Sequence, residues 1–311
     1  MPPVEPMKTS LDHLPAGKRA ELSRVAEILF DEFRAALAAH PLQTKKPAEI
    51  LKVVLFGSYA RGGWVDEPKS KPNRYQSDFD ILVVVSHKEL ADAETYWFAA
   101  EERLTREAME ATPVSFIVHS LGEVNESLER GQYFFVDILK EGIALFEKPG
   151  HPFRKPKPLT PAAALAEAQA AFDHWFPMGL EFVETYRDRL ENGSRNMAAF
   201  QLHQAAERLY VAYILTQTLY RPKTHNLKHL RSLAEGADTR FLDVWPLGAP
   251  GGRRAFARLK AAYVDARYSE HYEIERAELV WLGERVGVLR GLVKTLCQER
   301  IAELKANTSG S

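Results

Sequence analysis

The sequence predicts an α/β domain followed by an all-α helical bundle, an α+β two-domain chain. Short β-branched runs alternate with helical patterns before residue 148, and no strand-like run follows residue 161. The intervening segment, KPGHPFRKPKPLTP, contains five prolines, which fix φ and donate no backbone hydrogen bond. We therefore expect an α/β domain over 1–147, a proline-rich linker over 148–160 and a helical bundle over 161–311.

The composition is that of a globular chain. Its 311 residues are 45% apolar and 27% charged, which excludes disordered, collagen-like and disulfide-stapled classes. The 41 Lys and Arg residues nearly balance the 42 Asp and Glu residues, so the net charge does not indicate a protein that coats nucleic acid through its overall positive charge. The single cysteine, Cys297, and the lack of a long apolar run or signal-peptide pattern predict a cytoplasmic protein.

The first domain alternates helices and strands. Apolar residues at helical spacing predict a helix over 18–38, and LKVVLF predicts a strand over 51–56. ILVVV predicts a second strand over 81–85, which a helix over 89–110 follows. VSFIV predicts a third strand over 114–118. These elements build a small sheet with helices packed on it.

The second domain carries helical patterns only. A helix is expected to begin at Pro161, because proline is favoured in the first turn of a helix. Apolar periodicity predicts further helices over 196–219, 226–234, 255–263 and 274–305. This pattern predicts a helical bundle.

Polar residues with binding chemistry cluster after the first strand and at the start of the second. Gly57 directly follows the first strand, where a glycine lets the backbone approach a ligand, and Ser58 offers a hydroxyl for phosphate oxygens. Asp78 and Asp80 are two residues apart, so on a strand they share a face at about 7 Å. Two such carboxylates can bind Mg²⁺. Either feature alone is typical of a turn or a solvated strand end, but together they indicate a phosphate and metal site.

GSYARG followed by SDFDILVVV resembles the minimal version of the nucleotidyltransferase fold of DNA polymerase β-like enzymes, over about residues 18–146. The resemblance implies that Gly57 and Ser58 bind the triphosphate of a nucleoside triphosphate, expected to be ATP. It also implies that Asp78 and Asp80 are catalytic and hold Mg²⁺. Such an enzyme transfers a nucleoside monophosphate, here AMP, to a hydroxyl of a protein, an RNA end or a small molecule. Arg61 either adds a phosphate contact or is a surface arginine.

Two features depart from this family. Ser58 and Asp78 are separated by 19 residues, and residues 64–76 are expected to form an inserted, exposed loop over the site entrance. The family also has a third carboxylate on the next strand, where this sequence has Ser115. His119 lies about 13 Å farther along the same strand face, too far for a simple replacement; it could act as a base or be a strand-end surface residue. The alternative function is therefore a non-catalytic nucleotide-binding or regulatory protein.

The second domain resembles the HEPN family of helical bundles (higher eukaryotes and prokaryotes nucleotide-binding) over about 161–300. The resemblance rests on AAFQLHQAAERLYVAYIL, THNLKHL and YVDARYSEHYEI. In some members an Arg and a His with four to six residues between them cleave RNA, but here only three residues separate Arg267 from His271. Arg267, Tyr268 and His271 are therefore candidates for contacting a nucleotide or phosphate, with ordinary helix packing as the alternative. A toxin-antitoxin-like fusion with an RNA-binding or RNA-cleaving module is a further alternative.

Tyr272 is a candidate acceptor of AMP. It follows His271 directly, and in paired systems of this kind the nucleotidyltransferase modifies a tyrosine beside the HEPN histidine. The other interpretation is a tyrosine packed at the start of the last helix. Resemblance to bundles that pair through their helices also predicts a homodimer with two-fold symmetry.

The THNLKHL segment contains a predicted cap and a histidine pair. Thr224 is a candidate N-cap of the helix that follows. His225 and His229 are four residues apart, a spacing that can bind zinc on a helix. Because no cysteine or evident carboxylate completes the set, a cap and a surface residue are the favoured roles.

Overall fold

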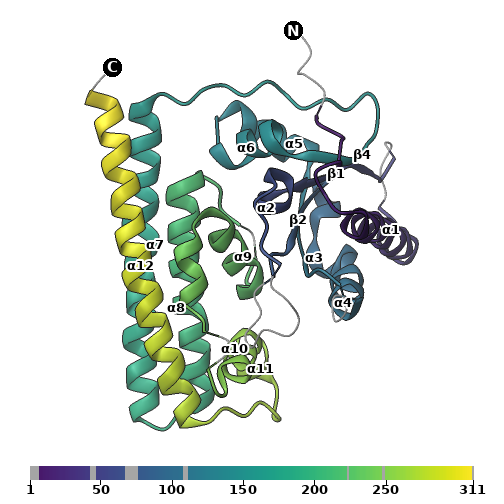
Figure 1. The fold of residues 1–311 in the computed structure, drawn as a ribbon. Coiled ribbons are helices and arrows are strands. Elements are labelled where there is room, and N and C mark those ends of the chain that lie inside the picture. The colour runs from purple at the N-terminus through teal and green to yellow at the C-terminus, as the bar shows by residue number, and fades with distance from the viewer. Residues whose placement is uncertain are drawn as a thin grey trace. The chain divides into compact units, whose positions relative to one another are not determined.

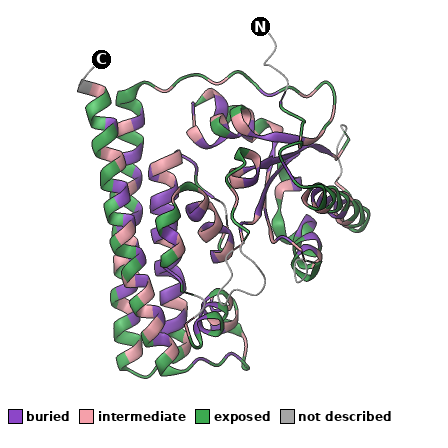
Figure 2. Ribbon diagram, viewed as in Figure 1, coloured by how far each residue is buried: buried purple, intermediate pink, exposed green. Residues whose placement is uncertain are grey.

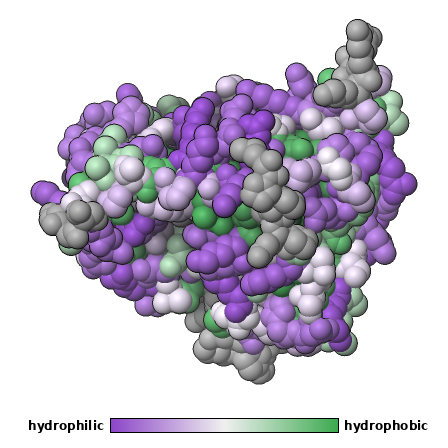
Figure 3. Space-filling model, turned by 90° about the horizontal axis from the view of Figure 1, so that it is seen from above, coloured by the Kyte–Doolittle hydropathy of each residue, from purple (hydrophilic) through white to green (hydrophobic). Residues whose placement is uncertain are grey.

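The computed structural model describes residues 7–42, 47–66, 76–107, 111–222, 224–246 and 249–309. The chain forms two compact units, of which the main part of the first ends at Pro158 and that of the second begins at Leu159 (Figure 1). Among the described residues, no helix is long and apolar enough to cross a membrane. The face seen in Figure 3 is mainly hydrophilic, with small hydrophobic patches.

The first unit is built on a mixed four-stranded sheet with the order β3-β2-β1-β4. Its strands are β1 (Ile50–Phe56), β2 (Phe79–Val85), β3 (Val114–Ser120) and β4 (Ile143–Glu147). β1 is antiparallel to both of its neighbours, whereas β2 and β3 are parallel. The three strands expected from the sequence are therefore present, and β4 is a fourth strand that was not predicted.

One face of the sheet packs against α1 (Ala16–Ala39) and the helices between β2 and β3. The prediction of a single continuous helix over 89–110 is wrong. The Asp92 carboxylate accepts the Thr95 backbone N–H and starts a new helix there. The described part of this region therefore has three short helices: η1 (Lys88–Ala91), α3 (Ala93–Tyr96) and α4 (Phe98–Glu107).

The helices α5 (Leu121–Glu129) and α6 (Tyr133–Glu141) lie on the other side of the sheet (Figure 1). A capping box between Ser120 and Glu123 starts α5 directly at the end of β3. Phe79, Ile81, Val83 and Val85 of β2 belong to the core on the α1 side, so the alternate residues face away from that core. Figure 2 shows that the strands are mostly buried and that exposed residues lie on the outer faces of the helices.

The second unit is all-α in its described residues, as predicted. Its three longest helices are α7 (Pro161–Glu191), α8 (Arg195–Thr218) and α12 (Arg276–Ser309). Pro161 begins α7, and the Thr160 hydroxyl caps it by accepting the Ala163 backbone N–H. The shorter helices are α9 (Leu227–Ala237), η2 (Thr239–Asp243), α10 (Gly252–Ala261) and α11 (Asp265–Tyr268).

The start of α9 corrects two expectations. Its N-cap is Asn226, whose side-chain oxygen accepts the backbone N–H groups of Lys228 and His229. Thr224 lies two residues earlier, and its hydroxyl accepts the Asn226 backbone N–H, so it is not the cap of the helix. Because His225 precedes the cap, it does not share a helical face with His229.

Candidate functional site

The glycine-serine turn lies where β1 passes into the short helix α2 (Gly57–Arg61). Gly57 has φ +74°, and a Cβ placed on it would be 2.3 Å from Asp80 Oδ2. Only glycine adopts this conformation readily and leaves the carboxylate its space. Gly62 caps the C-terminal end of this helix, and its backbone N–H donates to the Ser58 carbonyl.

The two aspartates lie at the beginning of β2. Asp78 directly precedes the strand and is half-buried, whereas Asp80 is its second residue and is 5% exposed. Phe79 between them is fully buried in the core, so extended backbone turns the two flanking carboxylates away from that core. Asp80 is paired with Phe56 of β1, the residue immediately before Gly57.

Ser115 occupies the position next to Asp80 on the parallel strand β3 and is buried. The described residues contain no group of three or more His, Cys, Asp or Glu side chains that could hold a metal ion. His119 pairs in register with Val84, four residues along from Asp80. It is buried, with Nδ1 3.8 Å from Glu123 Oε2 and its ring against Phe135, so it is not a strand-end surface residue.

The residues present fit a hard divalent cation. Asp80 lies in a space that a Cβ on residue 57 would fill, and Asp78 adds a second carboxylate two residues away. Mg²⁺ is commonly bound by one or two carboxylates, with substrate phosphates and water completing its coordination. Asp78 and Asp80 would therefore be the protein's ligands in such a site.

Arg61 lies in α2 with Gly57 and Ser58. Its guanidinium is 3.7 Å from Glu141 Oε2 at the end of α6, and both side chains are partly exposed. An exposed pair at this distance is weak. A phosphate group beside α2 would compete with Glu141 for Arg61.

The predicted inserted loop is described only at its two ends, because residues 67–75 lie outside the described ranges. Val65 and Ser77 are joined by two hydrogen bonds, and Asp66 forms an isolated antiparallel bridge with Gln76. Trp64 stacks on Tyr59 with ring centroids 5.3 Å apart. The base of the insertion is thus closed and fastened to α2.

Three of the candidates in the second unit lie in α11 and just after it. Arg267 is exposed, donates from Nε to the Tyr263 carbonyl at 2.7 Å and contacts the rings of Phe200, Tyr263 and Tyr268. Tyr268 is 74% exposed, and His271 is also exposed. These side chains are therefore accessible in this unit.

Tyr272 differs from these neighbours because it is buried. Its hydroxyl donates to the Arg258 carbonyl at 2.9 Å, and burial raises the pKa of the phenol. A buried, hydrogen-bonded hydroxyl is a poor acceptor in the folded unit. The structure therefore favours the packing interpretation of Tyr272.

A buried carboxylate on α8 was not expected from the sequence. Glu207 is 1% exposed and contacts His225 Nδ1 at 2.9 Å and Arg208 at 2.7 Å. Burial alone would raise the pKa of Glu207, but the neighbouring His203 and His225 side chains, together with the positive charge of Arg208, lower it below its ordinary value. His225 is thus held by a carboxylate. The sequence feature that could have indicated this contact is the acidic Glu207 within the largely apolar run AAERLYVAYIL.

Comparisons with known proteins agree with this architecture. Residues 41–145 match the nucleotidyltransferase domain family and residues 172–293 match the HEPN domain family. The chain therefore carries a nucleotidyltransferase-family domain followed by a HEPN-family domain, which confirms the resemblances seen in the sequence. No curated protein matches the chain.

One solved structure with a match is a nucleotidyltransferase-like protein from Exiguobacterium sibiricum 255-15. It is 14% identical, and the match covers 90% of this chain and 78% of that one. The TM-score of 0.21 is too low to support any statement about shared geometry.

Proposed function

We propose that the first unit is a Mg²⁺-dependent nucleotidyltransferase that moves a nucleoside monophosphate, AMP in the favoured case, from a nucleoside triphosphate to a hydroxyl acceptor. One observation carries this proposal: the Gly57–Ser58 turn lies directly against the Asp80 carboxylate. A phosphate-binding turn and a metal-binding carboxylate must lie close together if one metal–triphosphate complex is to contact both. The match to the nucleotidyltransferase domain family supports the same reaction class.

In this proposal Gly57 and Ser58 bind the phosphates, Arg61 adds a cationic contact, and Asp78 and Asp80 hold Mg²⁺. When bound, Mg²⁺ would neutralise charge on the phosphates during transfer. The acceptor oxygen forms a bond to the α-phosphorus as the bond to the leaving pyrophosphate breaks. The acceptor proton passes to solvent, because Ser115 offers no carboxylate to receive it.

The acceptor is a protein, an RNA end or a small molecule, and the presence of a HEPN-family domain does not choose among them. Homodimerisation through helical faces also stays a prediction. A toxin-like role for the second unit would use Arg267 and His271, whose side chains are exposed but separated by only three residues.

The second candidate function is nucleotide binding without transfer. Ser115 beside Asp80 favours it, because the third carboxylate that would help to bind metal and activate an acceptor is replaced by a neutral side chain. The two functions share the same bound complex and differ only in turnover.

Incubation with α-labelled ATP and Mg²⁺, with and without candidate acceptors, tests the proposal. Transfer of label that requires Mg²⁺ and stops with EDTA supports the transferase. Mg²⁺-dependent binding without transfer to any acceptor supports the second candidate. Absence of both binding and transfer would overturn the proposed site.

A further inference from the structure

We propose that Lys18 is a positioning residue for the nucleotide site, although it lies on α1 and outside the glycine-aspartate motifs. It joins the segment that leads to Asp78 with the segment that leads to Ser115. This inference rests on the proposed function of the first unit.

Lys18 contacts two chain segments far away in sequence. Its Nζ donates to the Thr112 hydroxyl at 2.6 Å and lies 3.0 Å from the Asp66 carboxylate. Glu21, one turn along α1, lies 3.7 Å from the same nitrogen. Only 14% of the Lys18 side chain is exposed, so these contacts are more shielded from solvent than a surface ion pair.

The Asp66 contact fixes the segment before Asp78. Asp66 forms an isolated antiparallel β-bridge with Gln76, and its neighbour Val65 forms two hydrogen bonds with Ser77. The Ser77 N–H donates to the Val65 carbonyl at 2.8 Å, and the Val65 N–H donates to the Ser77 hydroxyl at 3.0 Å. Since Ser77 directly precedes Asp78, the ion pair with Lys18 holds the base from which Asp78 projects.

The Thr112 contact fixes the entrance to β3. Thr112 is buried, and both its backbone N–H and its hydroxyl donate to the Glu21 carboxylate. The next residue, Pro113, accepts the backbone N–H of Phe79 at 2.8 Å. Lys18 and Glu21 thus secure the point where β2 and β3 begin side by side, next to Asp80 and Ser115.

The same polar group reaches α2 through Tyr59, the residue after Ser58. The Tyr59 ring centroid is 6.0 Å from Lys18 Nζ, and the ring is buried. Burial, the largest effect, raises the pKa of Tyr59 to about 12. The negative charges of Asp66, Glu21 and Asp78 also raise this pKa, whereas Thr112 lowers it. Without Lys18, the carboxylates of Asp66 and Glu21 would lose their compensating charge close to Asp78.

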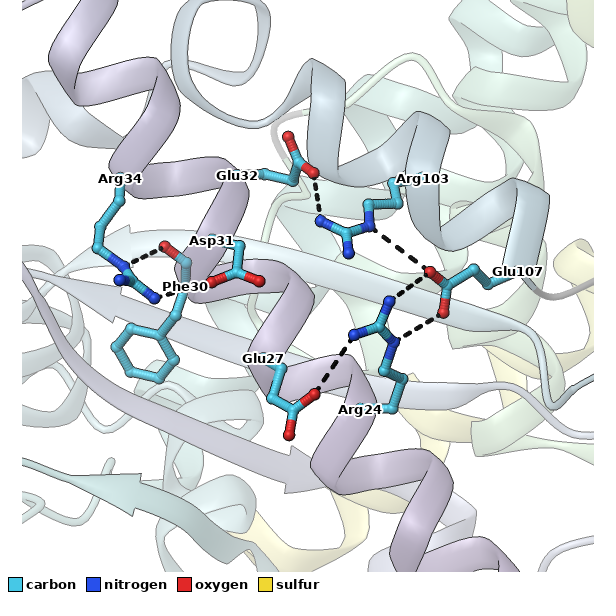
Figure 4. A network of polar contacts seen from close by, with 8 residues as sticks. All are labelled: Arg24, Glu27, Phe30, Asp31, Glu32, Arg34, Arg103 and Glu107. Carbon is cyan, nitrogen blue, oxygen red and sulfur yellow. Dashed lines mark hydrogen bonds and ion pairs between the residues drawn. The ribbon is translucent and has the colours of Figure 1, made fainter.

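Arg24 provides a matched control on the same helix. It binds Glu107 of α4 through two hydrogen bonds of 3.1 and 2.9 Å and ties α1 to α4, as Figure 4 shows. Its ion-pair partners among the described residues, Glu27 and Glu107, do not belong to the segments that lead to the site. Removing Arg24 therefore costs an inter-helix ion pair without releasing Asp78 or Ser115.

The test compares Lys18→Met, Lys18→Arg, Asp66→Asn and Arg24→Met in the full chain. Binding of a non-hydrolysable ATP analogue is measured by calorimetry at several Mg²⁺ concentrations, and melting temperatures are recorded in parallel. We expect Lys18→Met and Asp66→Asn to weaken binding by about tenfold or more and to shift the Mg²⁺ dependence to higher concentrations, as loss of a ligand-orienting contact does. Lys18→Arg should restore most of the affinity, and Arg24→Met should lower the melting temperature while leaving the affinity unchanged.

Wild-type affinity and Mg²⁺ dependence in folded Lys18→Met and Asp66→Asn would overturn the positioning role. If Lys18→Met does not fold, Asp66→Asn decides the question, because Asp66 is partly exposed. Failure of the wild-type chain to bind would instead refute the proposed function. Equal losses in Lys18→Met and Arg24→Met would assign the effect to general stability and also overturn the inference.

Discussion

Gly57 lies against Asp80 so closely that any side chain at position 57 would meet the Asp80 carboxylate, the nearest approach being 2.3 Å from Cβ to Oδ2. This contact brings the end of β1 and the start of β2 together as one site. Two independent features therefore require glycine at this position: its φ is positive, and a Cβ would have no room beside Asp80.

Gly57→Ala should therefore abolish nucleotide binding and destabilise the first unit. The control is Gly150→Ala, since Gly150 has φ +85° but nothing within 4 Å of its Cβ position. The control should cost only about 1–2 kcal/mol, the penalty of left-handed backbone for a residue with a Cβ. Calorimetric binding and urea unfolding of both variants check this; equal effects in the two variants would show that the approach to Asp80 is unimportant.

Ser115→Asp should raise Mg²⁺ affinity in the presence of nucleotide, because it places a third carboxylate beside Asp80 in the β2–β3 register. Ser115→Asn, which is similar in size but neutral, serves as the control and should not raise it. Burying another charge should lower stability in the absence of Mg²⁺. Mg²⁺ titrations followed by nucleotide binding measure the effect, and unchanged affinity in Ser115→Asp would argue against this position as the third carboxylate.

Tyr272 should remain unmodified after incubation with ATP and Mg²⁺. Its hydroxyl is buried against the Arg258 carbonyl. Tyr272→Phe should cost about 0.5–1.5 kcal/mol of stability through the lost hydrogen bond. Peptide mass spectrometry and urea unfolding provide the measurements; AMP on Tyr272 would show that this region opens in solution.

The stability of the second unit should fall between pH 7 and pH 5 through His229. Burial, with a smaller effect of the Lys228 charge, lowers the pKa of His229 from 6.5 to about 4. As the pH falls through 6.5, His229 takes up a proton in the unfolded chain but stays neutral in the folded chain. The stability that neutral His229 contributes is therefore complete above pH 6.5 and is lost as the pH falls toward 4. The loss from pH 7 to pH 5 should be about 2 kcal/mol.

Urea unfolding at the two pH values tests this effect. His229→Gln should reduce the pH dependence, whereas His271→Gln, which changes an exposed histidine, should retain it. A His229→Gln chain with the full wild-type pH dependence would contradict the assignment.

Much of the first unit could be predicted from local sequence. The β-branched runs after residue 50 and before Ser86 form strands because such residues suit a buried sheet, and the Gly57 and Asp80 motifs lie at their ends. β4 was missed because IALFE is short and only two of its five residues are buried. The break at Asp92 was missed because a capping side chain overrode a continuous helical pattern.

Side-chain environment in the second unit could not be predicted in the same way. Helical periodicity locates α8, but it does not reveal that Glu207 binds His225 from the segment before α9. Tyr268 and Tyr272 are four residues apart, yet one is 74% exposed and the other 4%. That difference depends on the packing of Tyr272 against α10, a contact between segments that the sequence pattern does not specify.

The most direct test of the nucleotide site is calorimetric titration of a non-hydrolysable ATP analogue into the wild-type chain, Asp78→Asn and Asp80→Asn, with and without Mg²⁺. Asp31→Asn, which removes an exposed carboxylate of α1, is the control. The proposed metal site predicts Mg²⁺-dependent binding in the wild type and the control, and a loss of that dependence in both site variants while their folds are retained. Identical Mg²⁺-dependent binding in all four chains would contradict it.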